Sequence, residues 1–252
     1  MLFLYCIQLY WFKFLICNET RRTVTENPSA FPYSFCSMHY NTGMTKVSEL
    51  KKLSVLPGIP EDDTCFHVYI YRNDHGQEIT GHVDIAVGNT LVSYGCHDPK
   101  HRLPLFLKGD GVLIQADRKA FLKHESVPGE MIIDYALNLS KEQMHAFLKK
   151  SDGFFEHMIP WQPSGKEDYA SILDRDIHPS FHKLKNHRYT EYNLFHNNCV
   201  TFVNDCIRDW LPGYHAWIQT PASFRNFMDS AYQKHNPLIH SRTIWYTPSE
   251  KR

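Results

Sequence analysis

The stretch from Cys65 to Gly95 decides the fold, and it reads CFHVYIYRNDHGQEITGHVDIAVGNTLVSYG. It contains three short runs in which side chains alternate in character and which are rich in β-branched and aromatic residues. The turn signals NDHG and GN separate these runs. The pattern therefore predicts three consecutive antiparallel strands.

The rest of the chain adds further strands and then helices. Two more strands are expected, over Gly111–Ala116 and Met131–Leu137. Ser140 and Gln143 have the spacing of a capping box, and the pair Thr220–Pro221 is a second helix-start signal. The residues between these two helix starts are mixed and mostly loop-like from position 160 to 192. The fold class predicted is α+β, an antiparallel sheet packed with helices.

Three regions follow from this pattern. Residues 1–62 are expected to be an apolar segment followed by a polar, turn-rich linker. Residues 63–236 are expected to form the folded domain, and residues 237–252 a C-terminal tail.

The apolar segment at the start of the chain has two interpretations. Residues 1–17 read MLFLYCIQLYWFKFLIC, which is short for a membrane span and carries a glutamine and a lysine. It is either a short anchor or an extension outside the working protein, with Met38 or Met44 as the natural start. A secretory signal is not indicated, because the basic start and the small-residue cleavage site are missing.

Composition excludes several classes of function. Lys plus Arg and Asp plus Glu are both 27, so the balanced charge does not favour a nucleic-acid partner. The seven cysteines are an odd number without a C-x-x-C pair, which argues against a disulfide framework or a thiolate zinc site. We therefore expect a reducing, cytoplasmic setting, unless the first residues anchor the chain to a membrane.

One cysteine occupies a position suited to catalysis. In YNLFHNNCVTFVNDCIRDWLPG, from Tyr192 to Gly213, Asn198 is a good N-cap for a helix that begins at Cys199. The positive end of that helix favours a thiolate, and its free N–H groups could stabilise an oxyanion. Cys206 has neither advantage and is expected in the core.

A nucleophilic thiol needs a base, and His82 is the histidine with a structural reason to serve. It begins the third predicted strand and projects from the face opposite the aliphatic side chains of that strand. His196 lies in a loop too near Cys199 in sequence to be held over it. The remaining candidates are expected to be solvated: His75, His97, His178, His182 and His187. A metal site of His82, Asp84 and a distant histidine is a further alternative, but spacing fixes no third ligand, so no metal or other cofactor is expected.

The third residue of the site depends on one turn. If Gly88–Asn89 is a two-residue loop, Ser93 falls opposite Asp84 on the face of His82. If the loop has three residues, the register slips and Tyr94 becomes the diagonal neighbour that could hold the ring. We prefer Tyr94, and a dyad without a third residue is the remaining alternative.

Two motifs resemble those of a known superfamily. YNLFHNNCVTFVND is similar to the cysteine motif of PPPDE-type thiol isopeptidases, and GHVDIAVGNTLVSYG to their histidine motif. Histidine before cysteine marks the circularly permuted papain-like folds, which include the lecithin-retinol acyltransferase-like enzymes. In that second group a polar residue follows the histidine by twelve positions, where this chain has Tyr94. The whole region also looks like uncharacterised bacterial, Firmicute-type proteins of this superfamily.

The resemblance implies a thiol hydrolase. His82 would be the general base and Cys199 the nucleophile, with Asn198 and the Cys199 N–H near the oxyanion, and Asp84 and Ser93 in support. The expected substrate is a peptide, isopeptide or ester, processed through an acyl-enzyme. Acyl transfer, thioester hydrolysis and a catalytically silent binding module are the alternatives. Val200 and the long separation of the two motifs depart from the isopeptidase pattern, which leaves the substrate open.

Overall fold

The computed structural model describes residues 50–52, 65–73, 81–103, 107–165 and 168–247. The chain divides into two units, residues 1–44 and 45–252, and every described residue belongs to the second. The apolar residues 1–17, the proposed starts Met38 and Met44, and His75 lie outside the described residues. None of the helices in the described ranges is long and apolar enough to cross a bilayer.

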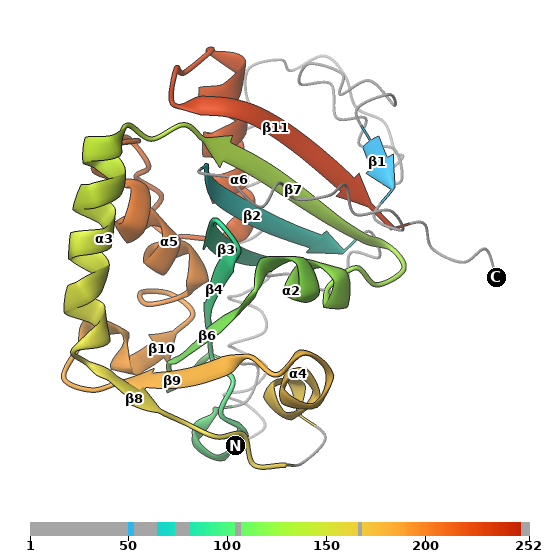
Figure 1. The fold of residues 1–252 in the computed structure, drawn as a ribbon, viewed down its shortest axis with the longest axis vertical. Helices are drawn as coiled ribbons and strands as arrows, with labels where there is room; N and C mark the ends of the chain where they lie inside the picture. Colours follow the sequence, from blue (N-terminus) through green and yellow to red (C-terminus); the bar gives the residue numbers. More distant parts are fainter. Residues whose placement is uncertain (1–49, 53–64, 74–80, 104–106, 166–167, 248–252) are drawn as a thin grey trace, which may run out of the picture. The chain divides into compact units, whose positions relative to one another are not determined.

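A nine-stranded sheet forms the centre of this unit, in the order β1-β11-β7-β2-β3-β4-β6-β9-β8 (Figure 1). β1 and β11 are parallel, and all other pairs in the sheet are antiparallel. The strands are β1 (Leu50–Lys52), β2 (Phe66–Asn73), β3 (His82–Val87), β4 (Thr90–Gly95), β6 (Val112–Asp117), β7 (Glu130–Leu137), β8 (Met158–Pro160), β9 (Ser180–Leu184) and β11 (Ile239–Tyr246). A separate two-stranded ladder joins β5 (Lys108–Asp110) to β10 (Glu191–Asn193).

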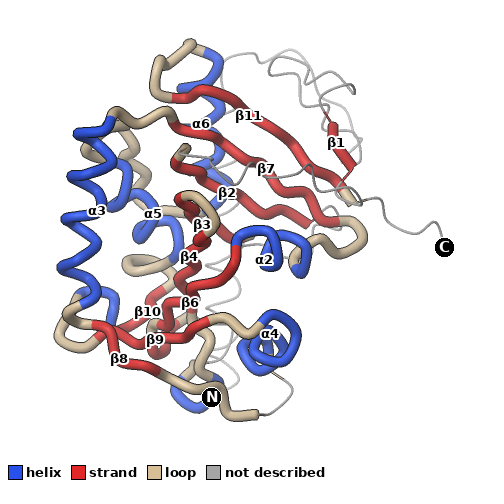
Figure 2. Tube along the Cα trace, viewed as in Figure 1, coloured by secondary structure: helices blue, strands red, loops and turns tan. Residues whose placement is uncertain are grey.

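Within the described residues, five α-helices accompany the sheet in two groups (Figures 1 and 2). The first group contributes side chains to the apolar cluster that also holds Cys199: α3 (Lys141–Phe155), α5 (Cys199–Ile207) and α6 (Pro221–Gln233). The second group packs in a separate cluster: α2 (Arg118–His124) and α4 (Tyr169–Ile177). Two short 3-10 turns complete the described elements: η2 (Pro99–His101) and η4 (Arg188–Thr190).

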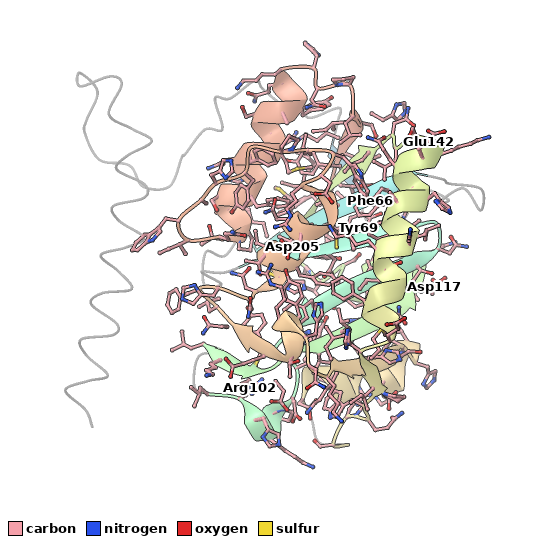
Figure 3. All side chains as sticks on the ribbon, turned by 90° about the vertical axis from the view of Figure 1, so that its left-hand side faces the viewer. Phe66, Tyr69, Arg102, Asp117, Glu142 and Asp205 are labelled. Carbon is pink, nitrogen blue, oxygen red and sulfur yellow. The ribbon has the colours of Figure 1, made fainter. Side chains whose placement is uncertain are left out.

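Strand β2 shows why the sheet needs both groups of helices. Phe66 belongs to the first cluster and Tyr69 to the second, although they lie on the same strand (Figure 3). Successive side chains of a strand point to opposite faces, and here both faces are apolar. The sheet is therefore buried on two sides by residues that alternate along one sequence.

The predicted α+β class is confirmed, with a large, mainly antiparallel sheet. The three strands from Cys65 to Gly95 form as β2, β3 and β4. At the start of α3 the capping box forms, because Gln143 N donates to Ser140 Oγ (3.2 Å) and Ser140 N donates to Gln143 Oε1 (2.8 Å).

Two parts of the chain differ from expectation. Residues 239–246, expected in a tail, form β11, which pairs with β7 along its length. The segment from 160 to 192, expected to be mostly loop, contains α4, β9 and η4. α4 begins at an N-cap, since Ser171 N donates to Asp168 Oδ1 (3.0 Å).

Candidate active site at the start of helix α5

Asn198 fixes the first turn of α5. Its Oδ1 accepts a hydrogen bond from Thr201 N (3.0 Å), which caps the helix as predicted. Its Nδ2 donates to the carbonyls of Leu194 and Gln219, both at 2.7 Å. Both amide protons are therefore used to hold the two loops beside Cys199. These hydrogen bonds describe how the Asn198 amide is held, and the expectation that Asn198 lies near the oxyanion stays a prediction.

Cys199 begins α5, the helix that packs against β3 and β4. Its side chain is almost completely enclosed, with 4% of the residue exposed. The first N–H groups of a helix have no acceptor within the helix, so they point their partial positive charge toward the thiol. The thiol is therefore at a helix start, as predicted, but it is covered.

His82 lies where two strands separate. β3 pairs with β2 as far as the Tyr71–His82 pair, but its pairing with β4 ends at Ile85–Val92. The end of β3 that carries His82 therefore pairs with β2 but not with β4. The His82 side chain is 31% exposed, which makes it the accessible member of the pair.

The Nε2 nitrogen of His82 lies beside two side chains. Nε2 lies 2.9 Å from Ser93 Oγ in a hydrogen bond. Asp84 Oδ1 is also 2.8 Å from Nε2, but off the direction of the N–H, so Asp84 acts on the ring chiefly through its charge. The Cys199 side chain lies close enough to the ring for its charge to raise the pKa of His82.

The surroundings favour a charged imidazole. Burial by itself lowers the pKa of His82, but the negative charge of Asp84 and then that of Cys199 outweigh it. The pKa of His82 is therefore raised well above its usual range. A positive ring beside Cys199 is the arrangement that stabilises a thiolate.

Tyr71 supports Asp84 from the neighbouring strand. Asp84 is fully buried, and Tyr71 pairs with His82 in the β2–β3 ladder, with the two rings 6.1 Å apart. Burial, followed by the charge of Asp84, raises the pKa of Tyr71 well above its usual range. Tyr71 thus stays protonated near Asp84, and its buried hydroxyl has no hydrogen-bond partner within the described residues. This residue was not predicted from the sequence.

The turn between β3 and β4 decides the third residue. Val87 pairs with Thr90, so Gly88–Asn89 is a two-residue loop, and Gly88 takes the positive φ of 55° that its first position requires. Ser93 accordingly lies on the His82 side, which was one of the two predicted registers.

The preference for Tyr94 is wrong. The hydroxyl of Tyr94 donates instead to the carbonyls of Tyr189 (3.1 Å) and Glu191 (3.2 Å). Its ring lies in the apolar cluster that also holds Cys199, against Phe202 of α5. Tyr94 therefore belongs to the packing beneath the site, and Ser93 is the residue that meets His82.

This correction gives a first prediction. Tyr94→Phe is expected to lower the free energy of unfolding by about 1–2 kcal/mol, because two carbonyls lose a donor, and to leave the alkylation rate of Cys199 unchanged. Ser93→Ala is expected to slow that alkylation several-fold, up to about tenfold, through loss of one hydrogen bond to the ring. Urea unfolding measures the loss of stability, and iodoacetamide kinetics measure the alkylation rate. If Tyr94→Phe slowed the alkylation of Cys199 and Ser93→Ala did not, Tyr94 would be the third residue of the site.

His97 is a second imidazole at the open end of the hairpin, and it is less solvated than predicted. Its ring lies over Gly95, where a Cβ would be 2.3 Å from Nε2. Nε2 is buried and accepts or donates no hydrogen bond within the described residues. Burial, the charge of His82 and that of Arg102 lower the pKa of His97 to about 3. The ring is therefore neutral, and the signal that could have indicated its position is Gly95.

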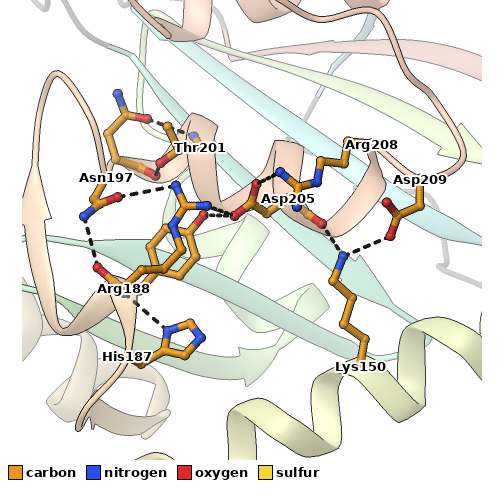
Figure 4. A network of polar contacts seen from close by, with 10 residues as sticks. Lys150, His187, Arg188, Asn197, Thr201, Asp205, Arg208 and Asp209 are labelled. Atoms are coloured by element: carbon orange, nitrogen blue, oxygen red, sulfur yellow. Dashed lines mark hydrogen bonds and ion pairs between the residues drawn. The ribbon is translucent and has the colours of Figure 1, made fainter.

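A network of polar contacts ties α5 to the loops around it (Figure 4). Asp205 accepts hydrogen bonds from Arg188 and Tyr189, both at 2.6 Å, and forms an ion pair with Arg208 at 3.1 Å. Asn197 Nδ2 donates to the carbonyl of Arg188 at 3.0 Å. The loop that carries Asn198 and Cys199 is thus held at both ends.

The other predicted histidines do not join the site. His178 takes a left-handed conformation after α4, His182 lies on β9, and His187 caps η4. Among the described residues the group with metal-ligand spacing is Asp98, His101 and Asp110, not His82 and Asp84. Lys183 already lies 2.6 Å from Asp98 and 2.7 Å from Asp110, so a cationic side chain occupies that group.

Comparison of the chain with models of known protein families, with curated proteins and with solved structures finds no match in any of the three. The chemistry of this site therefore stands on its geometry. It combines a thiol at a helix start, a nearby imidazole whose surroundings favour its charged form, and a buried carboxylate and a hydroxyl beside that imidazole.

Proposed function

We propose that this protein is a cysteine hydrolase of the circularly permuted papain-like type. It would act on a peptide, isopeptide or ester through Cys199 and His82. The observation that carries the proposal is that the His82 ring, held at Nε2 beside Asp84 and Ser93, lies close enough to Cys199 for the charge of the sulfur to raise its pKa, although the two residues are more than a hundred positions apart in sequence.

The reaction follows from this arrangement. His82 holds the proton of the thiol, and the Cys199 sulfur attacks the carbonyl carbon of the substrate. The tetrahedral intermediate collapses when His82 gives its proton to the leaving amine or alcohol, so that a thioester remains on Cys199. His82 then takes a proton from water, the resulting hydroxide attacks the thioester, and the acid product leaves with the thiol regenerated.

An amine or alcohol in place of water would make the same acyl-enzyme a transferase, and a thioester substrate would make it a thioesterase. Enclosure of the Cys199 thiol is the observation that favours a silent binding module instead. Acyl-enzyme formation separates the catalytic functions from the silent one, because a binding module has no reason to transfer an acyl group.

The test uses p-nitrophenyl acetate, a small activated ester. We expect a burst of p-nitrophenolate and an acetyl group on Cys199, located by peptide mass spectrometry. Cys199→Ala should abolish the burst, and Cys206→Ala, a matched change on the same helix, should retain it. Acetylation spread evenly over the thiols, or a burst that survives Cys199→Ala, would contradict the proposal.

A further inference from the structure

The segment between α5 and α6 is attached to the residue that precedes the candidate nucleophile. The carbonyl of Gln219 accepts a 2.7 Å hydrogen bond from Nδ2 of Asn198, and the same Nδ2 donates to the carbonyl of Leu194 at 2.7 Å. Two loops therefore meet at Asn198, one on each side of α5 in the sequence. Both lie beside the first turn of α5, where Cys199 is.

The second of these loops is held at both ends. At its start, Tyr214 is buried, its hydroxyl is 2.7 Å from Ser223 Oγ, and its ring packs on Phe224 with ring centroids 5.0 Å apart. At its end, Thr220 caps α6, because its Oγ1 accepts a hydrogen bond from Ser223 N at 3.1 Å. The backbone of residues 215–219 is thus fixed from both sides.

Trp217 lies on this loop and is almost completely exposed to solvent. Its exposed fraction is 86%, whereas the next most exposed large apolar side chain among the described residues is Leu103, at 53%. Removing the large apolar surface of an indole from water is favourable, and tryptophan is enriched among the residues that dominate binding at interfaces. An exposed indole on a backbone fixed at both ends is therefore suited to contact a ligand.

The first loop carries a second aromatic side chain. Phe195 is partly exposed, and its backbone N–H donates to Asn193 Oδ1 at 2.9 Å. It follows Leu194, whose carbonyl is one of the two that accept from Asn198. Phe195 and Trp217 therefore lie on the two loops that meet at Asn198, and neither ring is buried.

The position of Trp217 relative to Cys199 suits an extended substrate. Trp217 precedes Gln219 by two residues, so their Cα atoms are at most about 7 Å apart. Gln219 is hydrogen-bonded to the residue before Cys199. An extended peptide advances about 3.4 Å per residue, so a peptide of several residues with one carbonyl at Cys199 reaches this loop. An acetyl group is shorter than one residue and is not expected to reach it.

The geometry points to Trp217 as a specificity-determining residue, whose indole binds an apolar side chain of a polypeptide substrate while the scissile carbonyl lies at Cys199. This inference rests on the proposed function and narrows its substrate class to polypeptides with an apolar side chain a few residues from that carbonyl. The side chain belongs to the acyl half of the substrate, which stays bound to Cys199 through both steps of the reaction. Phe195 extends the same apolar surface, and neither ring takes part in proton transfer.

Three kinds of p-nitrophenyl ester test the inference: the acetate, the decanoate, and acetylated tripeptide esters with one phenylalanine and two glycines, the phenylalanine at each position in turn. Trp217→Ala is expected to slow acylation of Cys199 by the fastest of these peptides about 10- to 100-fold, a range typical of an anchoring aromatic side chain, and to change acetylation by no more than about twofold. Trp217→Phe keeps an aromatic ring and should retain most of the peptide rate. The control Leu148→Ala removes a 48% exposed apolar side chain from α3 and should change no rate.

The outcomes separate this inference from the proposed function. An unchanged peptide rate in Trp217→Ala would overturn the inference alone, and the acetate rate checks that the variant is folded. Slowing with the decanoate but not with the peptides would also overturn it, since the indole would then bind an acyl chain. Equal slowing with the acetate and the peptides would overturn it as well, because Trp217 would then act on the thiol. A wild-type protein that none of the esters acylates at Cys199 would overturn the proposed function itself.

Discussion

Replacing His82 with alanine is expected to slow alkylation of Cys199 by iodoacetamide at neutral pH by about 100-fold or more, the range that a positioned acid–base group contributes. The imidazole lies near the thiol, and its raised pKa favours a positive charge on the ring. Without the ring, only the start of α5 remains to stabilise the negative sulfur. Pseudo-first-order labelling, followed by peptide mass spectrometry, measures the rate at each cysteine.

His196→Ala is the matched control for this experiment. His196 is exposed and close to Cys199 in sequence, but no contact places its ring against the thiol. The rate at Cys206 should be unchanged in both variants, because burial raises the pKa of that thiol to about 12. If His196→Ala slowed the alkylation of Cys199 as much as His82→Ala does, the assignment of His82 as the base would be wrong.

Asp84→Asn is expected to lower the pKa of His82 and to slow Cys199 alkylation by about 10- to 100-fold. This range corresponds to the free energy that an interaction with a charged group contributes. Burial lowers that pKa, and the charge of Asp84 is the largest contribution that raises it. Asparagine keeps the shape of the side chain but removes the charge. An NMR titration of the His82 ring measures the shift directly, and an unchanged titration would contradict the role of Asp84.

The same substitution is expected to change how the free energy of unfolding depends on pH. Because the pKa of His82 is raised on folding, its charged form adds stability that is fully present below the usual histidine pKa. That stability is lost as the pH rises through the pKa of the folded state. Urea unfolding should therefore show that the advantage of the wild type over Asp84→Asn shrinks as pH increases. Asp209→Asn, a 60% exposed carboxylate on the surface, should show no such trend.

Much of the site could be predicted because its signals are local. Alternation along β2, β3 and β4 needs only neighbouring residues, and Asn198 caps the helix that follows it directly. The position of His82 at the start of a strand follows from the same alternation. These features give the thiol and its base, but not the distance between them.

The missed features depend on contacts between distant parts of the chain. β11 carries polar residues and becomes a strand because β7, more than a hundred residues earlier, pairs with it. The sequence favours Tyr94 as the third residue, but its hydroxyl donates to the carbonyls of Tyr189 and Glu191. These acceptors are distant in sequence, so no local pattern indicates them. The amide of Asn198 is likewise used by a carbonyl at Gln219, which no spacing rule indicates.

The most direct test compares the alkylation rates of Cys199 and Cys206 in the wild-type protein at neutral pH. Both residues are almost equally enclosed, at 4% and 7% exposure, and they share one helix. A difference in alkylation rate therefore reports the reactivity of the thiol more than its access to solvent. We predict that Cys199 reacts about 100-fold faster or more, as a thiolate held by His82. Equal rates at the two cysteines would contradict the Cys199–His82 pair and the hydrolase built on it.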